Sequence, residues 1–116
     1  MVLKYMCETR VCSIIDVDME NKTVKVTNFT NDILMRPFGK NEHPTWEDYE
    51  AFLARRCVPK SRDKLKWHLR EIGVDHYDPL TIVTKTQGRM AEDNFWIDIE
   101  EKEPEFPMNS YIEEKE

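Results

Sequence analysis

The sequence contains little glycine, only 3 residues among 116, and no two of these glycines lie close together. Phosphate-binding loops need closely spaced glycines, so the common nucleotide-binding motifs are excluded. The 3 cysteines are odd in number and lack CxxC spacing, which argues against a disulfide framework and a zinc ribbon. No apolar run approaches the roughly 18 residues of a transmembrane helix, and charges interrupt the N-terminus where a secretory signal would be apolar. We therefore expect a soluble, cytoplasmic protein that does not contact membranes.

Catalytic signatures are also missing. The three histidines, His43, His68 and His76, have no partner at metal-ligand spacing, so we predict no metal and no cofactor. Cys57 lies among basic residues, which favour the thiolate, but no histidine with an orienting acid stands beside it in the sequence. A buried residue that fills the turn between two helices is the favoured interpretation of Cys57. The sequence predicts a protein that is not an enzyme.

Charge is distributed unevenly along a chain whose formal net charge is −6. The segment from Arg55 to Arg70 contains seven bases and a single acid, Asp63. The segment from Asp98 to Glu116 has the opposite composition, with eight acids and two bases. The negative net charge argues against general affinity for nucleic acid, whereas the basic segment is a candidate binding surface.

Alternating apolar residues predict three strands. Val11–Met19 and Thr23–Phe29 both show a period of two and are separated by a short polar turn, which predicts a β-hairpin. Asn94–Ile99 alternates in the same way and is free to join the hairpin in one sheet. The first ten residues are mixed and are expected to lead into the first strand.

Helical spacing and capping signals predict three short helices between the second and third strands. Thr45, with Asp48 three residues later, forms a capping box for a helix that runs to about residue 56. Ser61 is the predicted N-cap of a second helix, which Gly73 ends. A third helix begins at Asp78-Pro79 and closes at residue 88.

The resulting order, β-β-α-α-α-β, predicts an α+β fold. A small antiparallel sheet, made of the N-terminal hairpin and the C-terminal strand, is expected to pack against the three helices. Residues 1–100 are predicted to form a single domain. Residues 101–116 form an acidic tail that we expect to be mobile.

The basic segment is the predicted partner-binding surface. Its second helix directs Leu65, Leu69 and Ile72 inward, which leaves Trp67 exposed among lysines and arginines. An exposed tryptophan in this setting suits a protein hot spot or stacking on a nucleobase, and a solvated helix face balanced by the acidic tail is the plainer alternative. The loop from Leu34 to Glu42 is expected to join the contact surface. The predicted contact residues are Arg55, Arg56, Lys60, Arg62, Lys64, Lys66, Trp67 and Arg70.

Four runs of the sequence resemble a known group of proteins. They are Phe52–Arg62 (FLARRCVPKSR), Leu69–Gly73 (LREIG), Tyr77–Leu80 (YDPL) and Lys85–Ile97 (KTQGRMAEDNFWI). Similar runs occur in small Firmicutes and phage-borne proteins that accompany HipA-like serine/threonine kinases of toxin–antitoxin type. The resemblance implies an accessory or regulatory partner and not a kinase, because the chain is too short for a kinase fold and lacks the kinase motifs.

Two classes of function follow from these observations. The first is a non-enzymatic, protein-binding module with a regulatory role, whose partner is a HipA-like kinase in a toxin–antitoxin or phage-defence setting. The alternative is nucleic-acid binding through the basic helix of residues 55–70, or a phage inhibitor that mimics nucleic acid with its acidic surface. Salt separates protein from phosphate binding, because contacts with phosphate weaken steeply as salt increases.

Overall fold

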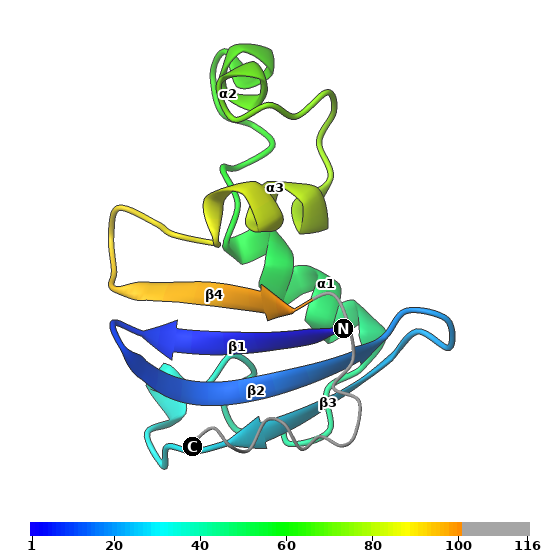
Figure 1. Ribbon diagram of the computed structural model, residues 1–116, viewed down its shortest axis with the longest axis vertical. Helices are drawn as coiled ribbons and strands as arrows, with labels where there is room; N and C mark the ends of the chain where they lie inside the picture. Colours follow the sequence, from blue (N-terminus) through cyan, green and yellow to red (C-terminus); the bar gives the residue numbers. More distant parts are fainter. Residues whose placement is uncertain (101–116) are drawn as a thin grey trace.

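The computed structural model describes residues 1–100, which form a four-stranded antiparallel sheet with helices on one side, the second helix lying farthest from the sheet (Figure 1). The strands are β1 (Val2–Cys7), β2 (Arg10–Asp18), β3 (Thr23–Asn28) and β4 (Phe95–Glu100), in the spatial order β3-β2-β1-β4. The helices are α1 (Trp46–Arg55), α2 (Leu65–Glu71) and α3 (Pro79–Thr86), and a 3₁₀ turn, η1 (Ile33–Met35), precedes them. The predicted α+β class is confirmed. The acidic tail of residues 101–116 lies outside the described part of the chain.

The sheet contains one strand that the sequence pattern does not predict. β1 lies between β2 and β4, so the C-terminal strand pairs with β1 and not with the hairpin. Val2, Leu3, Tyr5 and Met6 are all buried, although neighbouring residues of a strand point to opposite faces. A central strand with apolar residues on both faces shows no alternation, which is why the period of two fails to reveal it.

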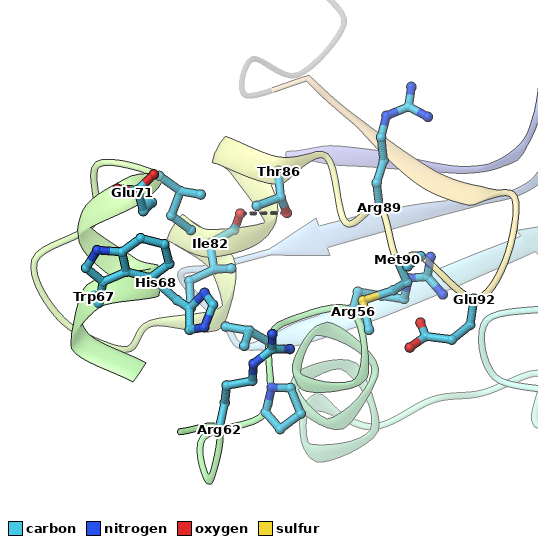
Figure 2. A pocket seen from close by; sticks show the side chains of 14 residues that line it. Arg56, Arg62, Trp67, His68, Glu71, Ile82, Thr86, Arg89, Met90 and Glu92 are labelled. Atoms are coloured by element: carbon cyan, nitrogen blue, oxygen red, sulfur yellow. Dashed lines mark hydrogen bonds between the residues drawn. The ribbon is translucent and has the colours of Figure 1, made fainter. Parts of the chain in front are cut away.

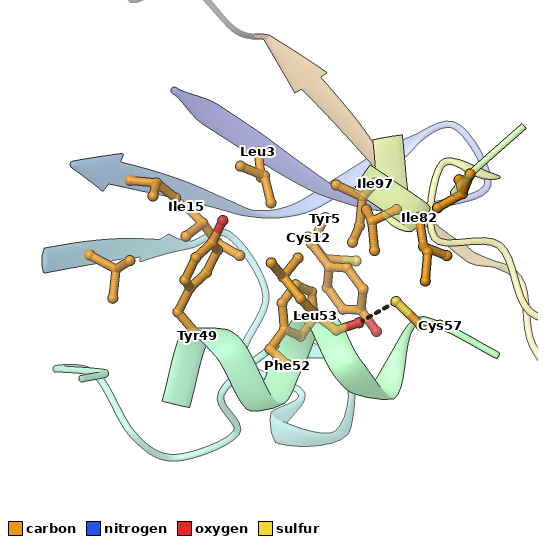
Figure 3. Close-up of a cluster of buried hydrophobic side chains, with 14 of the residues drawn as sticks. Leu3, Tyr5, Cys12, Ile15, Tyr49, Phe52, Leu53, Cys57, Ile82 and Ile97 are labelled. Carbon is orange, nitrogen blue, oxygen red and sulfur yellow. Dashed lines mark hydrogen bonds between the residues drawn. The ribbon is translucent and has the colours of Figure 1, made fainter. Parts of the chain in front are cut away.

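One hydrophobic cluster joins the sheet to the helices (Figure 3). Leu3, Ile15 and Ile97 project from three different strands toward α1, where Phe52 lies almost fully buried. Tyr5 adds an edge-to-face contact with Phe52, with ring centroids 5.2 Å apart. This packing fixes α1 on the sheet and gives the other two helices a rigid base.

α1 begins as predicted. The backbone N–H of Asp48 donates to Thr45 Oγ1 at 3.1 Å, and the N–H of Thr45 donates to Asp48 Oδ2 at 2.9 Å, which completes the capping box. The hydrogen bond from the Thr45 backbone also holds the pKa of Asp48 below its usual value. The predicted start of this helix, with Thr45 and Asp48 as its capping box, is therefore confirmed.

α2 begins later than predicted, and Ser61 is not its N-cap. The chain turns after Pro59, whose carbonyl accepts a hydrogen bond from the N–H of Arg62 at 3.0 Å. Lys64 then takes a left-handed backbone conformation, with φ of +57°, and occupies the N-cap position without a side-chain hydrogen bond. The serine signal is overridden because the turn at residues 59–64 occupies the first predicted helical positions.

The end of α2 and the start of α3 follow the prediction more closely. Gly73 has a φ of +79°, and the N–H of Val74 donates to the carbonyl of Leu69 at 2.9 Å, as in a Schellman motif. α3 starts at Pro79 with Asp78 as N-cap, but the Asp78 carboxylate accepts from the hydroxyl of Thr81 at 2.5 Å and not from the helix backbone.

Candidate functional site

A groove of about 560 Å³ lies between α2, the C-terminal half of α3 and the segment of residues 89–92 (Figure 2). We call it the α2–α3 groove. Its apolar lining comes from Val58, Pro59, Trp67, Ile72, Ile82, Met90 and Ala91. Its polar lining comes from Arg56, Arg62, His68, Glu71, Thr86, Arg89 and Glu92. The groove thus offers apolar surface with charged groups of both signs.

Trp67 and His68 form one wall of the groove on α2 (Figure 2). Trp67 leaves 53% of its surface exposed, which is unusual for so large an apolar side chain. The imidazole of His68 meets the indole edge-on, with ring centroids 5.1 Å apart. Leu69 between α2 and the core holds the helix down, so the tryptophan is presented on a supported surface.

Arg56, on the opposite wall, is buried and its charge is already paired. Its guanidinium donates to both carboxylate oxygens of Asp93 at 2.9 and 3.0 Å, and to the carbonyls of Gly88 and Phe95 at 2.9 Å each. The side chain is only 8% exposed, and the hydrogen bonds from Arg56 lower the pKa of Asp93. The side chain of Arg56 therefore connects the segment before β4 to the end of α1, and its contact with a partner stays a prediction.

The other predicted contact residues divide between several surfaces. Arg62 and Trp67 both line the groove. Arg55 points elsewhere and donates to the carbonyl of Pro37 at 3.0 Å. The ammonium of Lys60 lies over the ring of Tyr77, 5.5 Å from its centroid. The remaining three predicted bases are exposed on or beside α2 but outside the groove lining: Lys64, Lys66 and Arg70.

The loop from Leu34 to Glu42 does not join the groove. Leu34 is 90% exposed, but η1 lies at the opposite end of the longest axis from α2 (Figure 1). The molecule extends 45 Å along that axis. The predicted single surface is thus two separate regions, since a linear sequence does not reveal which exposed segments face the same way.

Sequence reasoning missed the far wall of the groove. Met90 and Glu92 line it, and Arg89 extends away from them to lie 4.7 Å from the ring centroid of Trp96. The indole N–H of Trp96 in turn donates to the carbonyl of Glu8 at 2.7 Å. These residues fall in the run KTQGRMAEDNFWI, so the signal was present, but nothing local in it indicates a position opposite α2.

The thiol of Cys57, which was considered as a nucleophile, is almost inaccessible to solvent. Cys57 is buried, and its Sγ lies 3.2 Å from the carbonyl oxygen of Leu53 and 3.5 Å from that of Pro79. Burial, with the charge of Asp78 nearby, raises the pKa of the Cys57 thiol to about 11. The favoured interpretation of Cys57 as a residue filling the helix junction agrees with this geometry.

Residues 1–100 contain no group of three or more histidine, cysteine or acidic residues placed to hold a metal ion. No helix in the same part of the chain is long and apolar enough to cross a membrane. What the groove can do chemically is bind: it has apolar surface, an exposed indole and fixed charges. Comparison with known proteins returned no match, whether to a family model, to a curated protein or to a solved structure.

Proposed function

We propose that the protein is a non-enzymatic binding module that holds a segment of a partner protein in the α2–α3 groove. The observation that carries the proposal is the 53% exposure of Trp67 at the edge of an apolar groove. Tryptophan and arginine dominate the energetics of protein interfaces, particularly beside apolar surface that excludes water. Arg62 supplies a cation that is not engaged with an acid among residues 1–100.

The chemistry of the groove suggests which segment it accepts. Isoleucine, valine and methionine side chains favour an apolar anchor residue, and Arg62 in the groove lining favours an acidic residue beside that anchor. The resemblance to proteins that accompany HipA-like kinases makes such a kinase the first partner to test. In that setting the module acts in the cytoplasm as a regulator.

Nucleic-acid binding is the second candidate, favoured by the position of Trp67 among Lys64, Lys66 and Arg70. Two of the seven bases in the segment are less suited to phosphate, because Arg56 is paired with Asp93 and Arg55 donates to a backbone carbonyl. A phosphate-binding surface gains from a continuous row of free bases. The interrupted row supports protein binding over nucleic-acid binding.

The test is a capture experiment with tagged protein, using a purified HipA-like kinase and, separately, host lysate. Trp67→Ala and Arg62→Ala are expected to weaken capture of a protein partner at least about tenfold each, a loss of about 1.4 kcal/mol or more. Lys66→Ala, on the same helix but outside the groove, is the matched control and is expected to change capture less than about threefold.

Ionic strength decides between the candidates. Protein capture through the groove should change little between 50 and 300 mM salt, whereas phosphate contacts would lose affinity steeply over that range. Capture that disappears after nuclease treatment, or that is unaffected by Trp67→Ala, would contradict the proposed function.

A further inference from the structure

A second hollow, of about 440 Å³, lies at the N-terminal ends of α1 and α3. We call it the acidic hollow. Its walls include Trp46, Tyr49 and Glu50 from α1, Asp78 and Leu80 at the start of α3, and Met19 from the turn after β2. The α2–α3 groove lies at the other end of the same two helices, so the two sites share no lining residue.

The apolar part of the acidic hollow is aromatic and sulfur-containing. The rings of Trp46 and Tyr49 lie with their centroids 4.9 Å apart and their planes at 50°, and Trp46 is the more exposed of the two because Tyr49 is almost fully buried. The thioether side chain of Met19 is 48% exposed beside them. The faces of tryptophan and tyrosine carry negative electrostatic potential, which attracts organic cations.

The charged part of the hollow has one sign. Glu50 and Asp78 line it, and no lysine, arginine or histidine does. Neither carboxylate takes part in an ion pair with any residue of 1–100. The N-terminal ends of α1 and α3 each contribute roughly half a positive charge, which the two carboxylates exceed.

The hydroxyl group of Tyr49 provides a further sign of this negative environment. The residue is 2% exposed, and its oxygen is buried without a hydrogen-bond partner among the described residues. Burial, followed by the charges of Glu50 and Asp78, raises the pKa of Tyr49 to about 12. Burial is the larger cause of this shift, and the two carboxylates add to it.

We propose that the acidic hollow binds an organic cation, the ammonium or guanidinium group of a basic side chain or of a small alkylammonium compound. The indole of Trp46 supplies cation–π attraction and the two carboxylates supply charge. A metal ion fits this site less well, because no group of three or more histidine, cysteine or acidic residues converges there within residues 1–100, and the aromatic and thioether side chains do not replace the water that a hard cation loses. The inference is independent of the proposed function, since no residue of the groove takes part.

The test is a titration monitored by NMR through the indole N–H signals, which single Trp→Phe variants assign. The probes are choline, its uncharged carbon isostere dimethylbutanol, N-acetyl-lysine methylamide and N-acetyl-arginine methylamide. Choline or the amides are expected to shift the Trp46 signal with saturation and to leave the Trp67 signal in place. The uncharged isostere is expected to bind at least about tenfold more weakly. Binding of the amides identifies a side-chain ligand, and binding of choline alone identifies a small molecule.

Substitutions in the acidic hollow test whether the NMR shift of Trp46 comes from binding at this site. Glu50→Gln and Asp78→Asn are each expected to weaken binding about fivefold, whereas Glu47→Gln, exposed on the same helix but outside the hollow, should leave it unchanged. Because Asp78 also begins α3, Glu50→Lys provides a second variant that does not alter a helix cap and should abolish binding. Equal binding of choline and dimethylbutanol, no saturable shift at Trp46, or an unchanged affinity in Glu50→Lys would overturn the proposal.

Discussion

The α2–α3 groove and the acidic hollow occupy opposite ends of the same helix pair, and each contains a tryptophan. In the groove, Trp67 stands beside Arg62 on a segment rich in bases. In the hollow, Trp46 stands beside Glu50 and Asp78. Two tryptophans thus lie on surfaces that differ in the charges of their neighbouring side chains.

The orientation of the helices explains how the charges became separated. α1 and α3 both begin at the hollow and both end at the groove. Acids are favoured at helix N-termini and bases at C-termini, so two helices that run the same way collect opposite charges at their two ends. Asp78 follows this preference as the N-cap of α3, whereas Glu50 lies inside α1 and Arg62 lies outside the helices, so packing also contributes to the separation.

The largest expected effect comes from removing the guanidinium of Arg56 at the wall of the groove. Arg56→Ala leaves Asp93 and two carbonyls without their donor, and we expect the free energy of unfolding to fall by about 3 kcal/mol. Urea denaturation measures the change. Arg62→Ala, an exposed control in the same groove, should cost less than about 0.5 kcal/mol. Equal costs for the two variants would show that Arg56 does not hold the wall in place.

The glycines that end α2 and α3 provide the next comparison. Both have positive φ, but a Cβ at Gly88 would lie 3.0 Å from Ile97 Cδ1, whereas one at Gly73 meets nothing closer than 4.0 Å. We expect Gly73→Ala to cost about 1 kcal/mol from backbone strain alone, and Gly88→Ala to cost about 2 kcal/mol or more. Thermal unfolding of both variants measures the difference. A Gly73→Ala variant that is the less stable of the two would contradict the packing described for the end of α3.

Lowering the pH is expected to reduce the stability that Asp93 contributes at the wall of the groove. The pKa of Asp93 is lowered chiefly by the hydrogen bonds from Arg56, so its stabilising effect is complete above the ordinary value of 3.8 and is lost as pH falls through the lower folded value. The stability difference between wild type and Asp93→Asn is therefore expected to shrink between pH 5 and pH 2. Asp18 and Asp48 also have lowered pKa values, but they are present in both proteins and cancel. A difference that is constant across this pH range would contradict the pairing.

The sequence predicted most of the local structure and little of the site's geometry. The Thr45 capping box and the end of α2 at Gly73 depend on residues within a few positions of each other, and both were correct. β1 was not predicted, because burial on both faces removes the alternation that identifies a strand. The pairing of Arg56 was missed for a different reason: its partner Asp93 lies 37 residues away, and no local pattern relates them.

Local sequence patterns also could not distinguish the α2–α3 groove from the acidic hollow in advance. The basic segment was correctly identified as charge-rich, but three-dimensional packing directed Arg55 to Pro37, buried Arg56 and left Arg62 beside Trp67. The acidic hollow combines one residue from a strand turn with residues from two helices, so only the tertiary structure assembles it. Charge composition predicts the sign of a surface, and packing decides which charges share it.

The smallest expected effect tests the comparison directly, by fluorescence quenching with ions of opposite charge. In variants that retain one tryptophan, iodide is expected to quench Trp67 at least about twofold more efficiently than Trp46, after correction by neutral acrylamide for exposure. Caesium should reverse the order, because Glu50 and Asp78 concentrate cations near Trp46. Both preferences should decrease as sodium chloride is added, since the excess of ions around each indole is screened. Equal iodide-to-caesium ratios at the two tryptophans would mean that the neighbouring side chains do not set the local potential, and the electrostatic distinction between the groove and the hollow would fail.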